Sequence, residues 1–242
     1  MQRYFTDEQL TVGATVTLDK DIQHHAITVL RMQEGAQFEL ASDGRAHHVT
    51  IVTTKPLSVH VDDNIDRNVE LPVNVTLVCG LSKAQKPEWI VQKGTELGAS
   101  TIYFTGSEWA TVRWQQDKVA KKLARLQQVA ASAAEQSHRN MIPQVAFLPK
   151  LTDAAQLTAD AKVIAYEESA KEGETAALVA AVQKRPQSLI AVFGPEGGIA
   201  PAEIDSLTAA GFAPAGLGPR ILRTETAPLY LLSAISTLTE LL

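Results

Sequence analysis

Cysteine is nearly absent from this 242-residue sequence. The single Cys79 has no second cysteine to pair with, so a disulfide-stabilised secreted fold is excluded. The first ten residues lack the apolar core of a signal peptide, and no apolar run approaches the roughly 18 residues that a membrane span needs. We therefore expect a cytoplasmic protein with no membrane-embedded part.

Motifs for metal ions and nucleoside triphosphates are also missing. The sequence has no CxxC or HExxH pattern, no GxxxxGK[ST] run and no GxGxxG after the first strand of a βαβ unit. Histidines occur as the adjacent pairs His24-His25 and His47-His48, which on a strand would point to opposite faces. We expect no metal site and no triphosphate-binding loop.

Positive charge is in short supply, because 27 acidic residues outnumber 22 basic ones and the net charge is −5. This balance argues against nucleic acid as a partner, since phosphate binding usually leaves a basic footprint. A local basic face is still present around the start of a predicted helix over 117–138. It comprises Arg113, Lys118, Lys121, Lys122 and Arg125. Two interpretations are open for it: a solvated helix face or an RNA contact.

The chain is predicted to form two domains, 1–71 and 72–242. Residues 37–61 alternate between apolar and polar and are broken by Asp43-Gly44 and Lys55-Pro56, which indicates short antiparallel strands. Beyond residue 72 the pattern predicts strands that alternate with helices, hence an α/β fold with a mostly parallel sheet covered on both faces. Predicted strands lie at 73–81, 101–106, 161–169 and 188–193, and predicted helices at 86–99, 117–138, 173–185, 201–211 and 226–242.

Two glycine-rich loops follow apolar segments of this second domain. The first, Gly194–Gly198, comes directly after a predicted strand, and Pro201 then opens a helix. The second, "LGPRILRTETA", begins at Leu217, and Thr224 or Thr226 can cap the last helix. Either loop alone could be an ordinary turn. Together they favour a shared ligand pocket at the carboxyl edge of the sheet.

"GPEGGIAPAEI", followed about twenty residues later by "LGPRILRTETA", resembles the signature of the SPOUT-class knotted methyltransferases. "QKGTELGA" and "AAEQSHRNMIP" also match the small-subunit (16S) ribosomal RNA uridine-N3 methyltransferase family, and the resemblance covers essentially the whole chain. "HHAITVLRMQEG" and the strands after it resemble that family's PUA-like RNA-binding β-barrel. The resemblance implies a deep trefoil knot, a homodimer, S-adenosylmethionine as cofactor and 16S ribosomal RNA, in an assembled small subunit, as partner.

The resemblance also assigns residues. Those expected at the cofactor are Gly194, Glu196, Gly197, Gly198, Leu217, Gly218, Ile221, Leu222, Arg223 and Thr226. Those expected at RNA are Arg3, His25 and Arg31, although a half-buried position at a strand edge is an alternative for His25. The match also makes Lys93, Glu96 and Gln136 candidates for the site. Alternatively they lie on ordinary helix ends, where Gly98 is the αL cap of one helix and Arg139 lies near the C-terminus of the other.

Methylation at N3 of uridine requires the loss of a weakly acidic proton and stabilisation of the resulting anion. Arginine suits the second task because its guanidinium stays charged, so Arg223 and Arg139 are the candidates. Glu225 or Glu135 could accept the proton if partial desolvation raises its pKa, and water could do the same. Among the tryptophans, we expect Trp89 in the core, while Trp109 and Trp114 could stack on bases.

Two other functions are compatible with parts of the sequence. One is a catalytically inactive RNA-binding ribosome assembly factor with the same fold. The other is an unrelated α/β enzyme that binds an anionic small molecule at the Gly194 loop. The intact "GPEGG" and "ILRTETA" segments argue against the first, and the second loop and the N-terminal β domain argue against the other.

Overall fold

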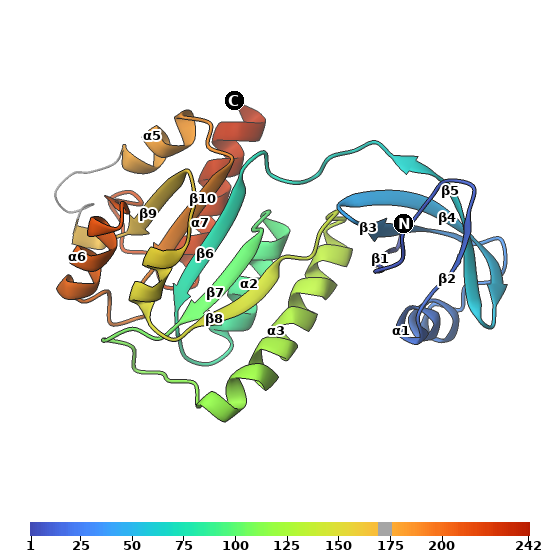
Figure 1. Cartoon of the computed structure of the whole chain (residues 1–242), viewed down its shortest axis with the longest axis horizontal. Helices are drawn as coiled ribbons and strands as arrows, with labels where there is room; N and C mark the ends of the chain where they lie inside the picture. The colour runs from blue at the N-terminus through green and yellow to red at the C-terminus, as the bar shows by residue number, and fades with distance from the viewer. Residues whose placement is uncertain (169–175) are drawn as a thin grey trace. The chain divides into compact units, whose positions relative to one another are not determined.

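The structure, a computed structural model, describes residues 1–168 and 176–242, and the chain divides into two compact units (Figure 1). The first unit comprises Met1–Glu70 and Ala134–Ile142, and the second comprises Leu71–Ala133 and Pro143–Leu242. The sequence predicts a boundary near residue 71. No change of composition signals that the short segment 134–142 also joins the first unit.

The N-terminal unit is built on a five-stranded sheet with the order β1-β3-β4-β5-β2. Its elements are β1 (Arg3–Phe5), β2 (Thr15–Thr17), α1 (Lys20–Gln23), η1 (His24–Val29), β3 (Gln37–Ser42), β4 (Arg45–Thr54) and β5 (Leu57–Ile65). The predicted turn between β3 and β4 is confirmed, because Asp43 and Gly44 both have positive φ, at 49° and 74°, as a two-residue hairpin turn requires. Alternate strand residues such as Phe38, Leu40 and Val49 fill the core.

The two histidine pairs differ in their backbone. His47 and His48 lie on β4 and are buried and half-buried respectively, as the strand pattern predicts. His24 and His25 lie on a helical turn instead, so the strand interpretation is wrong there. Asp19 starts this helix by accepting hydrogen bonds from the amides of Asp21 and Ile22, both at 2.8 Å.

The C-terminal unit holds a six-stranded parallel sheet with the order β11-β9-β10-β6-β7-β8. Its strands are β6 (Asn74–Gly80), β7 (Thr101–Thr105), β8 (Gln144–Leu148), β9 (Ala161–Ala165), β10 (Ser188–Phe193) and β11 (Ala213–Ala215). Residues 189–193 of β10 are all buried, as expected for a central strand covered on both faces. Because β10 lies between β9 and β6, the carboxyl ends of β9 and β10 are neighbours.

Helices cover both faces of this sheet (Figure 1). They are α2 (Lys86–Glu96), α3 (Gln116–Gln136), η2 (Leu151–Gln156), α5 (Ala177–Gln183), α6 (Pro201–Ala209), α7 (Thr226–Ser236) and η3 (Thr237–Leu241). On one face α2 packs beside α7, and on the other η2 packs beside α6. The predicted α/β class is therefore confirmed, whereas the knotted path of the chain stays a prediction.

Some elements of the structure differ from those predicted from the sequence. β8, η2 and β11 were not predicted, and the predicted helix over 173–185 begins at residues that lie outside the described part of the chain. Pro201 opens α6 and Gly98, with φ of 93°, ends α2, both as predicted.

Within residues 1–168 and 176–242, no helix combines the length and apolarity that crossing a membrane requires.

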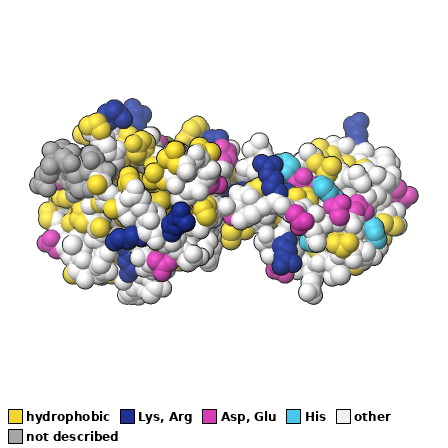
Figure 2. All heavy atoms as spheres, turned by 90° about the horizontal axis from the view of Figure 1, so that it is seen from above, with side chains coloured by type: hydrophobic (Ala, Val, Ile, Leu, Met, Phe, Trp, Pro, Cys, Tyr) yellow, Lys and Arg dark blue, Asp and Glu magenta, His cyan; other side chains and the backbone are white. Residues whose placement is uncertain are grey.

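Charged side chains do not form one large basic face in the view of Figure 2. In that view the Lys and Arg side chains of the C-terminal unit lie apart from one another, among hydrophobic side chains, and histidine and acidic side chains are prominent on the N-terminal unit. This distribution agrees with the net charge of −5. The face seen in Figure 2 therefore carries no large basic patch.

Candidate active site

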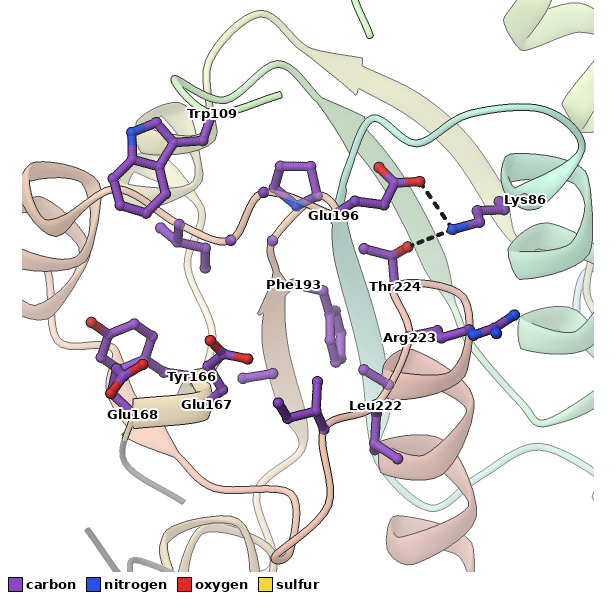
Figure 3. A pocket seen from close by; sticks show the side chains of 18 of the residues that line it. Lys86, Trp109, Tyr166, Glu167, Glu168, Phe193, Glu196, Leu222, Arg223 and Thr224 are labelled. Atoms are coloured by element: carbon purple, nitrogen blue, oxygen red, sulfur yellow. Dashed lines mark hydrogen bonds and ion pairs between the residues drawn. The ribbon is translucent and has the colours of Figure 1, made fainter. Parts of the chain in front are cut away.

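A cavity of about 630 Å³ opens in the C-terminal unit where β9 and β10 end (Figure 3). We call it the main cavity. Three segments line it: Tyr166–Glu168 after β9, Phe193–Ile199 at the end of β10, and Ile221–Thr224 before α7. The remaining lining residues are Lys86, Trp109, Ala165, Pro201 and Ala227. The two glycine-rich loops that the sequence singled out therefore meet at one site.

A second cavity of about 340 Å³ adjoins the main cavity. It shares Ala165, Tyr166, Glu167, Ile221, Leu222 and Ala227 with the main cavity and adds the segment 217–220. Of the residues expected at the cofactor, all except Thr226 line one of the two cavities. Thr226 is exposed at the start of α7, next to Ala227, which does line them.

The glycines of the first loop are required by the packing of the protein itself. A Cβ on Gly197 would lie 2.6 Å from the carbonyl oxygen of Trp109, and one on Gly194 would lie 2.8 Å from Cγ1 of Ile199. A Cβ on Gly80, at the end of β6, would lie 2.5 Å from the nitrogen of Pro195. The sequence predicts that Gly194 and Gly197 lie against a bound ligand. In the structure, Gly194 and Gly197 let the loop fold tightly against neighbouring backbone and side chains.

Lys86, at the start of α2, links the two glycine-rich loops. Its Nζ lies 3.0 Å from Oε1 of Glu196 in the first loop and 3.1 Å from Oε2 of Glu225 in the second. Nζ also donates to Oγ1 of Thr224 at 3.4 Å, and Figure 3 shows the contacts to Glu196 and Thr224. A single ammonium therefore holds both loops in position.

These contacts set the protonation of the three groups. The hydrogen bond to Glu196 raises the pKa of Lys86 above its ordinary value of 10.5. Partial burial acts to raise the pKa of Glu225, but hydrogen bonds from its own amide and from Lys86 outweigh it and bring the pKa below 4.5. Glu196 behaves in the same way. The raised pKa expected of a general base is therefore wrong for Glu225.

Arg223 reaches the cavity with its backbone and the base of its side chain. Figure 3 shows its guanidinium directed away from the cavity, and the residue is exposed. Its carbonyl accepts the amides of Thr226 and Ala227, at 2.8 and 3.0 Å, and so starts α7. Neither Thr224 nor Thr226 caps this helix with its side chain, so that prediction is wrong.

The other arginine candidate, Arg139, belongs to the N-terminal unit. It is 3% exposed and its guanidinium is paired with Glu70, whose other carboxylate oxygen accepts the amide of Asn140 at 2.8 Å. Glu135 and Gln136 lie in the same unit, and burial raises the pKa of Glu135. Arg139 does not line either of the cavities described above, and its contacts favour a structural role.

The residues expected at RNA occupy different environments in the N-terminal unit. Arg3 is 3% exposed and donates to Glu39, to the carbonyls of His138 and Arg139, and to Oδ1 of Asn140. His25 is half-buried, with Nδ1 2.9 Å from the hydroxyl of Tyr4. Arg31 is exposed, with φ of 56°. Arg31 is thus the most accessible of the three, whereas Arg3 is occupied within the protein.

Sequence reasoning missed several residues of the main cavity. Tyr166, Glu167 and Glu168 were assigned to the end of a strand, although a polar "YEE" directly after the apolar "VIA" signals that the strand has ended at the carboxyl edge of the sheet. Lys86 gave no signal, since its partners are 110 and 139 residues away in the sequence. Lys93 and Glu96 pair with each other at 2.8 Å on α2 and line neither cavity.

The tryptophans also correct one prediction. Trp89 is 52% exposed, so its placement in the core is wrong. Trp109 is 47% exposed and lines the main cavity above the Gly194 loop, as Figure 3 shows. Trp114 stacks on Phe147 with ring centroids 5.5 Å apart.

No group of three or more His, Cys, Asp and Glu side chains in the described part of the chain is placed to hold a metal ion. The site offers instead a half-open binding space with apolar side chains such as Phe193 and Leu222, backbone groups of two glycine loops, and the carboxylates Glu167 and Glu168, while Glu196 is paired with Lys86. Such a lining suits a small molecule that is part apolar and part cationic.

Comparison with known proteins agrees with this site. A family model described as an RNA methyltransferase domain matches residues 69–236, and one described as an RNA methyltransferase PUA domain matches residues 18–62. The chain is 43% identical to the ribosomal RNA small subunit methyltransferase E of Bacillus subtilis (strain 168), covering 100% of this chain and 98% of the relative. It is 33% identical to the protein of the same name from Mycobacterium tuberculosis, over 98% and 92% of the two chains.

A solved structure extends the comparison to the fold. The crystal structure of a ribosomal RNA small subunit methyltransferase E from Neisseria gonorrhoeae bound to S-adenosyl methionine matches with a TM-score of 0.83 and 32% identity, covering 98% of each chain. The chain belongs to the RNA methyltransferase family that includes these ribosomal RNA small subunit methyltransferase E proteins, and it carries the family's PUA domain at its N-terminal end.

Proposed function

We propose that this protein is an S-adenosylmethionine-dependent methyltransferase that methylates N3 of a uridine in the 16S ribosomal RNA of the small subunit. The observation that carries the proposal is the main cavity, in which the two glycine-rich loops meet at the carboxyl edge of the sheet. Relatives that align with the whole chain carry the methyltransferase name, and a similar structure was solved with the methyl donor bound.

The residues of the two cavities fit this cofactor. When bound, S-adenosylmethionine supplies a methyl group on a positively charged sulfur. The main cavity's volume of about 630 Å³ lies within the range of about 300–1,000 Å³ that is usual for small-molecule sites. Glu167 and Glu168 provide negative charge for a cationic ligand, while Phe193, Leu222 and Ile221 provide apolar contact.

The protein's own contribution to the reaction is positioning and electrostatics. Lys86 bridges Glu196 and Glu225 and so holds the two loops together at the cavity. Arg223 is an exposed residue at the rim whose guanidinium points away from the cavity, so its side chain has to turn toward the cavity to meet the carbonyl oxygens of a uridine anion. The proton at N3 passes to water in this scheme, because Lys86 keeps Glu225 ionised and weakly basic.

We further propose that the enzyme acts as a homodimer in the cytoplasm, on an assembled small ribosomal subunit. The exposed apolar side chains Tyr230 and Leu241, at 41% and 74% exposure, support a partner surface on α7 and η3. A catalytically inactive assembly factor has no specific observation in its favour, since the cavity and both loops are intact.

The test compares cofactor binding with methyl transfer. Ile221→Arg replaces a residue that lines both cavities and is 75% exposed, so the change should not disturb folding. We expect at least tenfold weaker S-adenosylmethionine binding in calorimetry, because a cation is added to a site for a cation. Val52→Arg, at an exposed apolar residue of β4, is the matched control and should bind like the wild type.

Product analysis then decides the reaction. Small subunits from a strain without this activity, and free 16S ribosomal RNA, are incubated with enzyme and methyl donor, and nucleosides are identified by mass spectrometry. N3-methyluridine formed on subunits supports the proposal. Binding without transfer to either substrate would favour the inactive assembly factor, and no binding by the wild type would refute the methyltransferase assignment.

A further inference from the structure

A third cavity of the C-terminal unit has four basic residues among the eleven that line it. It has a volume of about 320 Å³ and lies between the loop 82–85 that precedes α2, the segment 112–114 and the N-terminal half of α3. We call it the basic cavity. Its cations are Lys83, Arg113, Lys122 and Arg125, and its only acidic lining residue within the described chain is Glu88.

Two of these cations are held by specific contacts. Nζ of Lys122 lies 5.4 Å from the centroid of the Trp114 ring, and that ring packs in turn on Phe104 and Phe147. Arg125 is oriented by Glu88, with 2.9 Å between Nη2 and Oε1. Cations that are held in position before binding lose less conformational entropy when an anion arrives.

The floor of the cavity contains an unsatisfied hydroxyl. Ser82 is 3% exposed and lines the cavity, and its Oγ has no hydrogen-bond partner within the described residues. Buried hydroxyls in folded proteins nearly always have a partner. Because the oxygen atom is itself buried, this hydroxyl is an unsatisfied polar group beside the basic cavity and does not identify a ligand.

The basic cavity and the main cavity are lined by neighbouring residues of one segment, since Lys83, Ala84 and Pro87 line the former and Lys86 lines the latter. The amide of Lys83 donates to Oε1 of Glu196 at 3.3 Å, and Lys86, four residues after Ser82, lines the main cavity. An anion in the basic cavity would therefore lie next to the loop that shapes the cofactor site.

We propose that the basic cavity binds a backbone phosphate of the substrate RNA and so positions the target uridine over the main cavity. This inference rests on the proposed function. It divides the basic cluster of the sequence into two parts: Arg113, Lys122 and Arg125 line the cavity, whereas Lys118 and Lys121 lie on α3 outside it. It also shows how an acidic protein can hold RNA with a small number of placed cations.

The test compares two cations that line the basic cavity with a cation of α3 that lies outside it. Lys122→Gln combined with Arg113→Gln removes two cavity cations, and Lys121→Gln removes an exposed cation of α3 outside the cavity. Binding to unmodified small ribosomal subunits is measured by filter retention at several salt concentrations. We expect the double variant to bind about tenfold more weakly and its log–log salt slope to fall by about 0.7–0.9, the value for one lost phosphate contact. Lys121→Gln should change affinity less than twofold.

Two further measurements separate the possible failures. Calorimetric titration with S-adenosylmethionine and methyl transfer by the wild type test the proposed function alone, and their failure would leave the basic cavity without a substrate to position. If the wild type methylates subunits but the double variant binds them as the wild type does, the phosphate site is refuted. Equal losses in the double variant and in Lys121→Gln would refute it too, and would indicate a diffuse basic face.

Discussion

Lys86 is the residue that determines how charge is arranged at this site. Its ammonium contacts Glu196 and Glu225, which come from different loops, and each carboxylate is at least two-thirds buried. The paired carboxylates keep their negative charge above their ordinary pKa of 4.5, and Lys86 keeps its positive charge below 10.5. The network is therefore intact across the whole range in which the enzyme would be assayed.

The sign of each shift leads to a prediction on pH. Because the pKa of Glu225 is lowered in the folded protein, its ionisation stabilises the folded site above pH 4.5, and this stabilisation is lost as pH falls through the folded pKa. Because the pKa of Lys86 is raised, the stabilisation from its charge is lost only as pH rises beyond 10.5. We expect S-adenosylmethionine affinity to be flat from about pH 6 to 9. We also expect the rate of methylation to rise with pH over that range, because the uridine itself must lose a proton.

Glu225→Gln tests this interpretation in the same assay. If Glu225 only supports Lys86, the variant should keep the rising limb of the pH–rate profile at the same pH and show a raised KM for the cofactor. A general base would behave differently: its loss should lower kcat by about 10²–10⁴ and change the shape of the profile. Observing that pattern would restore Glu225 as the base.

At the scale of elements, the segment Ala134–Ile142 stands out because it completes the N-terminal unit. Nη1 of Arg3, on β1, donates to the carbonyls of His138 and Arg139 at 2.6 and 3.0 Å. Glu70 holds the same segment from the other side through Arg139 and the amide of Asn140. The segment thus supplies partners for the buried guanidinium of Arg3 and for the carboxylate of Glu70.

Glu70→Gln is predicted to destabilise the N-terminal unit by about 3 kcal/mol, because it leaves the buried guanidinium of Arg139 without its countercharge. Glu34→Gln, at an exposed residue of the same unit, is the control. Urea denaturation and amide exchange of residues 134–142 measure the effect. Equal stability of the two variants would show that Arg139 is not held by Glu70, and would reopen a role for Arg139 at the substrate.

Which elements could be predicted follows from how locally each is encoded. β10 and α6 were predictable because an apolar run, a glycine turn and Pro201 all lie within fifteen residues. β8 and β11 were missed because five and three residues at a sheet edge carry too little pattern. The two cofactor loops were found from their glycines and from the family resemblance, whereas Lys86 was missed because its partners are distant in sequence.

At the scale of the whole molecule, the chain leaves the first unit, forms part of the second and then returns for nine residues before it completes the second. A single cut near residue 71 therefore does not separate two complete folding units. The first unit would lose the partners of Glu70 and three of the four acceptors of Arg3, which would keep only Glu39, and removing hydrogen-bond partners from a buried guanidinium costs several kcal/mol.

A fragment of residues 1–70 is accordingly predicted to be far less stable than the same residues in the intact chain. Its core residues, such as Phe38 and Val59, are all present, so the deficit isolates the contribution of the returning segment. Joining residues 134–142 to residue 70 through a flexible Gly-Ser linker should restore much of the lost stability, because the carbonyls of His138 and Arg139 and the side chain of Asn140 become available to Arg3 again. Thermal melts by circular dichroism, with amide dispersion in NMR spectra, compare the two fragments.

A matched fusion that carries Asn140→Ala and Arg139→Ala should recover less stability. Identical melting of the plain fragment and both fusions would show that the returning segment contributes no stability to the N-terminal unit.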